Sequence, residues 1–246
     1  MIDLYSTGQI KKTLDTLNIL INKFPDEAWF YNISGACHQS LGQLHIAVIR
    51  YKKALAIKPG LVEAHSNLGI ALKELGQLND AINYYEKALK IKPDYAPAHY
   101  NLGIAFDELG QLDAAVNCYK QALTIKPNYA EAHNNLGFVL KELDQLDESC
   151  KSCKQALMIN PNYVEAHNNL GNALHDLGQL NEAVNCYKKA LEIKPDYAEA
   201  HNNLGIVFKD LGQRDAAFKH YNRSLEISPD YAEARDRKST RLNSSH

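Results

Sequence analysis

Apolar residues along this chain recur at the spacing of amphipathic helices, in pairs of short segments separated by polar turns. Leu68, Leu72 and Leu75 form one apolar stripe, and a second stripe runs through residues 81–89. Side chains three and four positions apart share one face of an α-helix. The pattern in residues 62–95 therefore predicts two helices joined by a turn, each with one buried face.

The pattern returns every 34 residues. Proline cannot continue a helix, because it lacks a backbone N–H, so a proline at a fixed position marks the end of each second helix. A glycine at another fixed position suits the left-handed residue that ends each first helix. The prolines stand at 25, 59, 93, 127, 161, 195 and 229. The glycines stand at 8, 42, 76, 110, 178 and 212, and Asp144 occupies the missing place. Such a period predicts a stack of helix–turn–helix units.

A further glycine lies inside the first helix of each unit, where it costs about 1 kcal/mol relative to alanine. Its regular recurrence predicts a close approach of the second helix, with a small residue opposite and an aromatic ring one turn further on. The glycines are 35, 69, 103, 137, 171 and 205. The small residues are Ala47, Ala81, Ala115, Ala183 and Ala217, and the rings are Tyr51, Tyr85, Tyr119, Tyr187 and Tyr221.

The residues before each first helix predict side-chain caps. Asp94 is a natural N-cap, and in most units a glutamate follows the capping residue three positions later, which is the capping-box pattern. These pairs are Asn128/Glu131, Asn162/Glu165 and Asp196/Glu199.

Together these positions resemble the tetratricopeptide repeat, a 34-residue family with small residues at its eighth and twentieth positions, an aromatic near the twenty-fourth and proline at the thirty-second. The resemblance implies an all-α fold, a right-handed α-solenoid (superhelix) of helix–turn–helix repeats. We call the first helix of a repeat helix A and the second helix B. Residues 1–27 are predicted to hold the end of a helix A and a whole helix B. The six complete repeats are 28–61, 62–95, 96–129, 130–163, 164–197 and 198–231.

The last residues, 232–246, begin a seventh repeat and then leave the pattern. Residues 236–246, DRKSTRLNSSH, resemble the translation of a widely used sequencing adapter and match it at every residue. This resemblance implies that native sequence ends near Arg235 and that the protein continues beyond it. We expect the tail to be disordered, and its basic residues are not interpreted as a localisation or nucleic-acid signal.

Composition narrows the functional classes. The formal net charge of −2 lacks the basic excess of a nucleic-acid-binding surface. No apolar run has the length of a membrane span, and the N-terminus has no signal-peptide pattern. The five cysteines have no disulfide-framework spacing and fit a reducing compartment. We expect a soluble, cytoplasmic protein.

One stripe of helix A is a candidate binding surface, through its second, sixth, ninth and thirteenth positions. The sixth position holds an asparagine in five repeats, and an amide can both donate and accept hydrogen bonds along a peptide backbone. This asparagine ladder is similar to that of O-linked N-acetylglucosamine transferases, whose repeats these resemble; a solvated polar position copied by repeat duplication is the alternative. The ladder is Asn67, Asn101, Asn135, Asn169 and Asn203, with Ile33 in the first repeat.

The neighbouring positions of the stripe add apolar contact and negative charge. The ninth positions are Ile70, Ile104, Phe138, Asn172 and Ile206. The thirteenth positions are Glu74, Glu108, Glu142, Asp176 and Asp210. The acids predict a partner with some positive charge, unless they only balance Lys73, Lys141 and Lys209 beside them. The hypothesis further predicts that Asn135→Ala and Asn169→Ala weaken peptide binding and leave thermal unfolding nearly unchanged.

Other constellations are interpreted as structural. The fifth positions lack the basic residues of a carboxylate clamp. A full repeat separates each of the histidines 65, 99, 133, 167 and 201 from the next, too far to share a metal ion. Cys150 and Cys153 form a lone C-x-x-C, in which Cys153 replaces the usual tyrosine. We expect no metal, no cofactor and no catalytic residue.

Three functional hypotheses follow. The first is a non-catalytic protein-interaction module that binds an extended peptide along the concave face of the superhelix. The second is the substrate-recruiting arm of a longer enzyme, resembling glycosyltransferases of the O-linked N-acetylglucosamine or SPINDLY kind, with repeat-bearing sulfotransferases or methyltransferases as further alternatives. The third is self-association through an uncapped end, where Phe218, Tyr221 and Leu225 are expected to be exposed.

Overall fold

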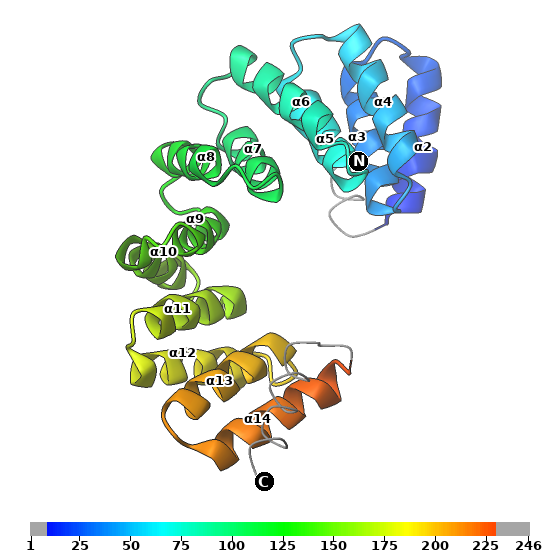
Figure 1. Cartoon of the computed structure of the whole chain (residues 1–246). Helices are drawn as coiled ribbons and strands as arrows, with labels where there is room; N and C mark the ends of the chain where they lie inside the picture. Colours follow the sequence, from blue (N-terminus) through cyan, green and yellow to red (C-terminus); the bar gives the residue numbers. More distant parts are fainter. Residues whose placement is uncertain (1–8, 230–246) are drawn as a thin grey trace. The chain divides into compact units, whose positions relative to one another are not determined.

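The computed structural model describes residues 9–229, and these form thirteen helices and no strand (Figure 1). The A helices are α3 (Ala28–Ser40), α5 (Val62–Glu74), α7 (Ala96–Glu108), α9 (Ala130–Glu142), α11 (Val164–Asp176) and α13 (Ala198–Asp210). The B helices are α2 (Ile10–Lys23), α4 (Leu44–Ile57), α6 (Leu78–Ile91), α8 (Leu112–Ile125), α10 (Leu146–Ile159), α12 (Leu180–Ile193) and α14 (Arg214–Ile227). The prediction of an all-α solenoid is confirmed.

The chain divides into two units, at residue 127. Helices α2 to α8 belong to the first unit and α9 to α14 to the second. Within each unit every helix A packs on the following helix B, and that helix B packs on the next helix A. The A helices of consecutive repeats also touch, as α3 touches α5 and α11 touches α13. The expectations for residues 1–8 and for the tail 232–246 lie outside the described residues.

The turn from helix A to helix B follows the sequence prediction. Gly76 has a φ of 75°, and the N–H of Gln77 donates to the carbonyl of Leu72 at 2.9 Å, as in a Schellman motif. Asp144 takes the same left-handed conformation with a φ of 58°, and it is the one non-glycine with positive φ among residues 9–229. Its turn is closed by the same bond, from Gln145 to Leu140 at 2.9 Å. The fourth repeat therefore keeps the turn geometry without its glycine.

The predicted capping boxes are wrong. Helix α7 begins at Ala96, its N-cap is Tyr95, and no side chain caps it. Helices α9, α11 and α13 likewise have a tyrosine N-cap without a side-chain bond. The reason is a β-turn in front of the helix, which is closed by a bond from the Tyr197 N–H to the Lys194 carbonyl at 3.2 Å. This turn contains the proline and the Asp or Asn, so the polar residue precedes the cap position.

The glycines inside the A helices do allow a close approach, as predicted, but the atoms that come close belong to the tyrosine. A Cβ placed on Gly69 would lie 2.5 Å from Cε1 of Tyr85. The same holds for the other glycines of the series, except that Gly137 faces the thiol of Cys153. Cys153 is fully buried, which confirms that it replaces the tyrosine as a small core residue. The helix B ring therefore occupies the space that a side chain would fill at the helix A glycine.

Candidate functional site

The predicted ladder falls on consecutive A helices in each unit. Asn67 and Asn101 lie on α5 and α7 of the first unit, and Asn135, Asn169 and Asn203 lie on α9, α11 and α13 of the second. All five side chains are half-buried. The adjoining ninth positions are half-buried too, except Phe138, which is 40% exposed. The stripe therefore combines partly accessible amides with accessible apolar groups.

The ladder amides bond to asparagines that the sequence analysis did not include. The Nδ2 of Asn67 donates to Oδ1 of Asn32 at 3.2 Å, and Asn32 is only 4% exposed. The same bond, between the sixth position and the fifth position of the preceding repeat, recurs in the second unit. It joins Asn169 to Asn134 at 3.0 Å and Asn203 to Asn168 at 3.2 Å. The spacing of 35 residues between partners was visible in the sequence, but their pairing requires the stacked A helices.

In the second unit this pairing grows into a network. Asn203 also donates to Oδ1 of Asn172 at 3.0 Å, and the hydroxyl of Tyr187 donates to the same oxygen at 2.7 Å. Asn168 donates to Glu199 at 2.8 Å. Buried polar groups are stable where they are hydrogen-bonded, so these bonds fix the A helices against each other. Asn172 at its ninth position is therefore explained as an acceptor for two neighbours.

Enough hydrogen-bonding capacity remains for a ligand. An asparagine amide offers two N–H groups and two lone pairs, and Asn67 and Asn169 each donate one N–H to a neighbour. Asn101 differs, because no hydrogen bond engages its amide within residues 9–229. Asn169 supports the buried Asn134, so Asn169→Ala should also lower stability, contrary to the expectation of unchanged unfolding.

Four of the five acids of the stripe, Glu108, Glu142, Asp176 and Asp210, have basic partners, which the sequence indicated only in part. Nζ of Lys73 lies 3.1 Å from Oε1 of Glu108 in the next repeat. Nζ of Lys141 lies 3.1 Å from Oε1 of Glu142 and 3.6 Å from Oδ2 of Asp176. His175 lies 2.7 Å from Asp210. Such half-exposed pairs contribute about 0–1 kcal/mol each. The negative charge of the stripe is thus offset at most positions, as the alternative interpretation of these acids expected.

The repeated histidines have a structural role. Nε2 of His65 lies 2.8 Å from the carbonyl oxygen of Pro59. Equivalent bonds to the proline six residues earlier are made by His99, His167 and His201, at 2.9, 2.9 and 3.1 Å. A carbonyl can only accept, so each ring carries its proton on Nε2. The bond satisfies the carbonyl of the proline in the turn that follows the preceding helix B.

His201 also meets a second histidine. Its Nδ1 lies 3.0 Å from Nδ1 of His220, and the two rings are stacked with centroids 5.2 Å apart. Burial, together with the charges of His201, Lys219 and Lys188, lowers the pKa of His220 to about 4. Since Nε2 of His201 donates to Pro195, the neutral pair requires His220 to donate from Nδ1. The pair is consequently neutral near physiological pH.

The cysteines have the character of core residues. Burial raises the pKa of Cys153 to about 12 and that of Cys186 to about 11, so both thiols are protonated and unreactive near neutral pH. Within the described part of the chain, no group of three or more His, Cys, Asp or Glu residues is arranged to hold a metal ion. None of the helices described between residues 9 and 229 combines the length and apolar character needed to cross a bilayer.

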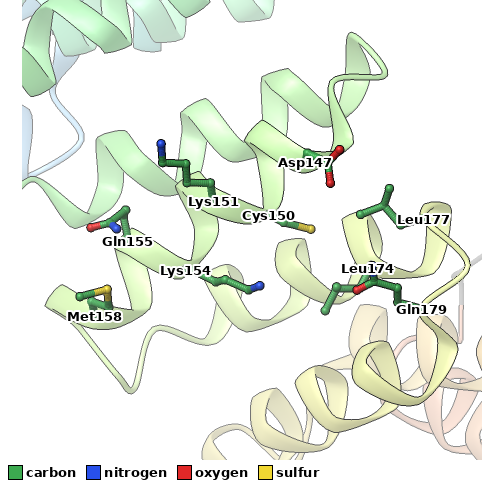
Figure 2. Close-up of a pocket in the computed structure, with 9 residues that line it drawn as sticks. All are labelled: Asp147, Cys150, Lys151, Lys154, Gln155, Met158, Leu174, Leu177 and Gln179. Carbon is green, nitrogen blue, oxygen red and sulfur yellow. The ribbon is translucent and has the colours of Figure 1, made fainter.

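A hollow of about 410 Å³ lies between α10 and α11, away from the stripe (Figure 2). Its apolar side is formed by Leu174 of α11 and by Leu177, which directly follows α11, and α10 contributes Cys150 and Lys154. Figure 2 shows the Cys150 thiol and the Lys154 amine pointing from α10 toward α11. Cys150 occupies a position that holds valine or isoleucine in the neighbouring repeats, so its smaller side chain helps to leave the space open.

The expected exposure of Tyr221 is wrong. Its side chain is 4% exposed, because the ring lies against Gly205 of the same repeat. Phe218 and Leu225 are half-buried. Self-association through this end stays a prediction.

Comparison with known proteins gives the same architecture. Solved structures similar to this chain include YrrB, described as a TPR protein with an unusual peptide-binding site. YrrB is 25% identical, with 77% of this chain and 97% of YrrB covered and a TM-score of 0.64. MamA is 26% identical over 68% of this chain and 97% of its own, with a TM-score of 0.61. PilF of Pseudomonas aeruginosa is 19% identical, with 88% of this chain and 98% of PilF covered and a TM-score of 0.77. At this identity the similarity shows the fold alone. A comparison with curated protein sequences found no match.

Family models match most of the chain. A model described as TPR repeat matches residues 38–76, 71–110, 106–144, 140–178 and 171–212, and one described as tetratricopeptide repeat matches 198–231. Repeats of this kind stack into extended surfaces used for protein interactions. The chain belongs to the tetratricopeptide repeat family.

Proposed function

We propose that this protein is an interaction module that binds an extended peptide along the stripe of its A helices. The observation that carries the proposal is the series of half-buried amides on the A helices, of which Asn67, Asn101 and Asn169 keep hydrogen-bonding capacity beside accessible apolar groups. An extended peptide presents an N–H and a C=O at each residue, and an amide can pair with both. In this proposal the residues of the stripe bind the peptide and have no catalytic role.

Asn101 gives the sharpest test. Peptides would be selected from a random dodecapeptide phage library, and the affinity of one selected peptide would be measured by fluorescence anisotropy. A hydrogen bond contributes about 0.5–1.5 kcal/mol, so Asn101→Ala should weaken binding about 2- to 12-fold. Because no hydrogen bond within the described residues involves this amide, and alanine is the better helix former, the thermal midpoint should stay the same or rise slightly.

Asn117→Ala is the matched control, because Asn117 is exposed on α8 of the same repeat and lies outside the stripe. It should leave the affinity unchanged and should affect the thermal midpoint in the same way as Asn101→Ala. Asn67→Ala should lower both, since Asn67 also supports the buried Asn32. Equal affinities of Asn101→Ala and the unmodified protein would refute a role for the ladder.

A recruiting arm of a longer enzyme would use the same stripe in the same way. The observation in its favour is the asparagine ladder, which is similar to that of O-linked N-acetylglucosamine transferases. Sequencing the source DNA across the Arg235 codon would separate the two proposals: several hundred further codons with a transferase-like domain would favour the arm, and an early stop codon would favour the stand-alone module.

A further inference from the structure

The first unit contains a second hollow, and this one lies on the stripe. It has a volume of about 350 Å³ between α3 and α5. Ala36 stands at the ninth position, where most other repeats carry isoleucine or phenylalanine, so the side chain that would fill this space is missing. The lining residues are Ala36, Gln39, Ser40, Tyr51, Asn67 and Glu74.

Tyr51 reaches this hollow from helix B because Gly35 lets its ring lie under helix A. A Cβ on Gly35 would come within 2.6 Å of Cε1 of Tyr51. The ring is therefore fixed, and its hydroxyl donates to Oε1 of Gln39 at 2.9 Å. Gln39 in turn donates from Nε2 to Oε1 of Glu74 at 2.8 Å. The chain of donors runs from the core to the Glu74 carboxylate and positions it at the hollow.

Four side chains around the hollow each donate a hydrogen bond to another group of the protein. Besides Tyr51 and Gln39, Asn67 donates from Nδ2 to Asn32 at 3.2 Å, and the Ser40 hydroxyl donates to the Ala36 carbonyl at 3.0 Å. On the acceptor side, neither the second oxygen of the Glu74 carboxylate nor Oδ1 of Asn67 has a hydrogen-bond partner among the described residues. A ligand that supplies several N–H donors matches this arrangement.

Glu74 also differs in charge from the other acids of the stripe. Glu108, Glu142, Asp176 and Asp210 each lie within 4 Å of a lysine or histidine. Within residues 9–229 Glu74 has no such ion pair, and its partner is the neutral amide of Gln39. The hollow therefore combines space, acceptors and one negative charge with no basic side chain of the described residues within 4 Å of it.

We propose that this hollow receives a lysine or arginine side chain of the bound peptide. The cationic group donates to Glu74 and Asn67, and the aliphatic part of the side chain lies over Ala36. Charge-assisted hydrogen bonds of this kind are stronger than neutral ones. This inference rests on the proposed function, which it deepens by naming one specificity-determining subsite for a basic residue.

The test uses pools of acetylated and amidated nonapeptides that are random except for a fixed central residue. The pools carry Lys, Arg, Gln, Leu or Glu at the centre, and binding to the full chain is measured by anisotropy of a fluorescent label. The Lys and Arg pools should bind about 3- to 10-fold more tightly than the Gln and Leu pools, and the Glu pool most weakly. The preference should shrink at high ionic strength, because Glu74 is exposed.

Two variants locate the preference. Glu74→Gln removes the charge and keeps an acceptor for Gln39, and Ala36→Ile fills the hollow with the residue found in other repeats. Both should abolish the preference, so that the Lys and Arg pools bind no more tightly than the Gln pool. Glu86→Gln, on the exposed surface of α6, removes the same charge elsewhere and should preserve the preference.

Three results would overturn the inference. Equal binding of all pools would remove the subsite and leave peptide binding in place. A preference that survives both Glu74→Gln and Ala36→Ile would place the basic residue elsewhere. Absence of binding by every pool, together with a failed phage selection, would overturn the proposed function itself.

Discussion

The contact between the helix A glycine and the helix B tyrosine predicts that Gly69→Ala destabilises the protein, although alanine is the better helix former. A Cβ on Gly69 would lie 2.5, 2.8 and 2.9 Å from three ring carbons of Tyr85. The ring is fully buried and cannot move into solvent. Overpacking costs about 1–3 kcal/mol, and three such contacts point to the upper part of this range. Helix propensity returns about 1 kcal/mol, which leaves a net loss of about 1–2 kcal/mol.

Urea unfolding would measure this loss, followed by far-UV circular dichroism and by the fluorescence of Trp29, the single tryptophan of the chain. Repeat arrays need not unfold in one step, so the two signals are recorded in parallel. Gly60→Ala is the control, because no atom lies within 4 Å of a Cβ placed there and its φ is not left-handed. It should be neutral or stabilising by up to about 1 kcal/mol.

A double-mutant cycle tests the cause. In a Tyr85→Leu background the ring is absent, so Gly69→Ala should cost less than about 0.5 kcal/mol or should stabilise. The reasoning would be refuted if Gly69→Ala raised the stability of the unmodified protein. It would also be refuted if the loss were the same in both backgrounds, since the tyrosine would then not be the group that excludes a side chain.

Two further predictions concern stability. Asp144→Gly should raise the free energy of unfolding by about 0.5–1 kcal/mol, because Asp144 has a φ of 58° where the other repeats have glycine. The reverse change, Gly110→Asp, should lower the free energy of unfolding measured with urea. If neither substitution changed it, the argument from backbone strain would be contradicted. The second follows from the pKa of His220, which is about 4 in the folded protein and about 6.5 in the unfolded chain. The unfolded chain then binds more protons, so stability should fall as the pH drops from about 6.5 to about 4. His220→Tyr, which introduces the residue found at Tyr84, should reduce this fall, and an equal shift of the urea midpoint in both proteins would argue against the assignment.

The local structure was predictable because its signals are local. Pro93 stops a helix wherever it stands, and Gly76 permits a left-handed turn without help from other residues. Asp144 replaces this glycine in the fourth repeat and adopts the same left-handed conformation, so the change of residue did not change the turn. The predicted side-chain caps were wrong although they too depend on local sequence, because the expected capping residue belongs to the β-turn that contains the proline and so precedes the cap position.

The candidate site could be located from the sequence but not understood from it. The 34-residue register placed Asn67, Asn101 and Glu74 on one stripe, since a fixed period on a helix fixes the face. The register could not show which amide pairs with which. Asn67 donates a hydrogen bond to Asn32, and Glu74 accepts one from Gln39, whereas Glu108 forms an ion pair with Lys73. Each of these contacts joins residues 35 positions apart in the chain, so none could be assigned from the sequence.

The sequence by itself therefore determined the helices, their turns and the face that each helix presents, because backbone propensity and helical periodicity act over a few residues. Only the tertiary structure decided what occupies the space beside Gly35 and Ala36 and which charges are offset. Packing and electrostatics depend on distances between residues far apart in the chain, and these exist only once the repeats have stacked.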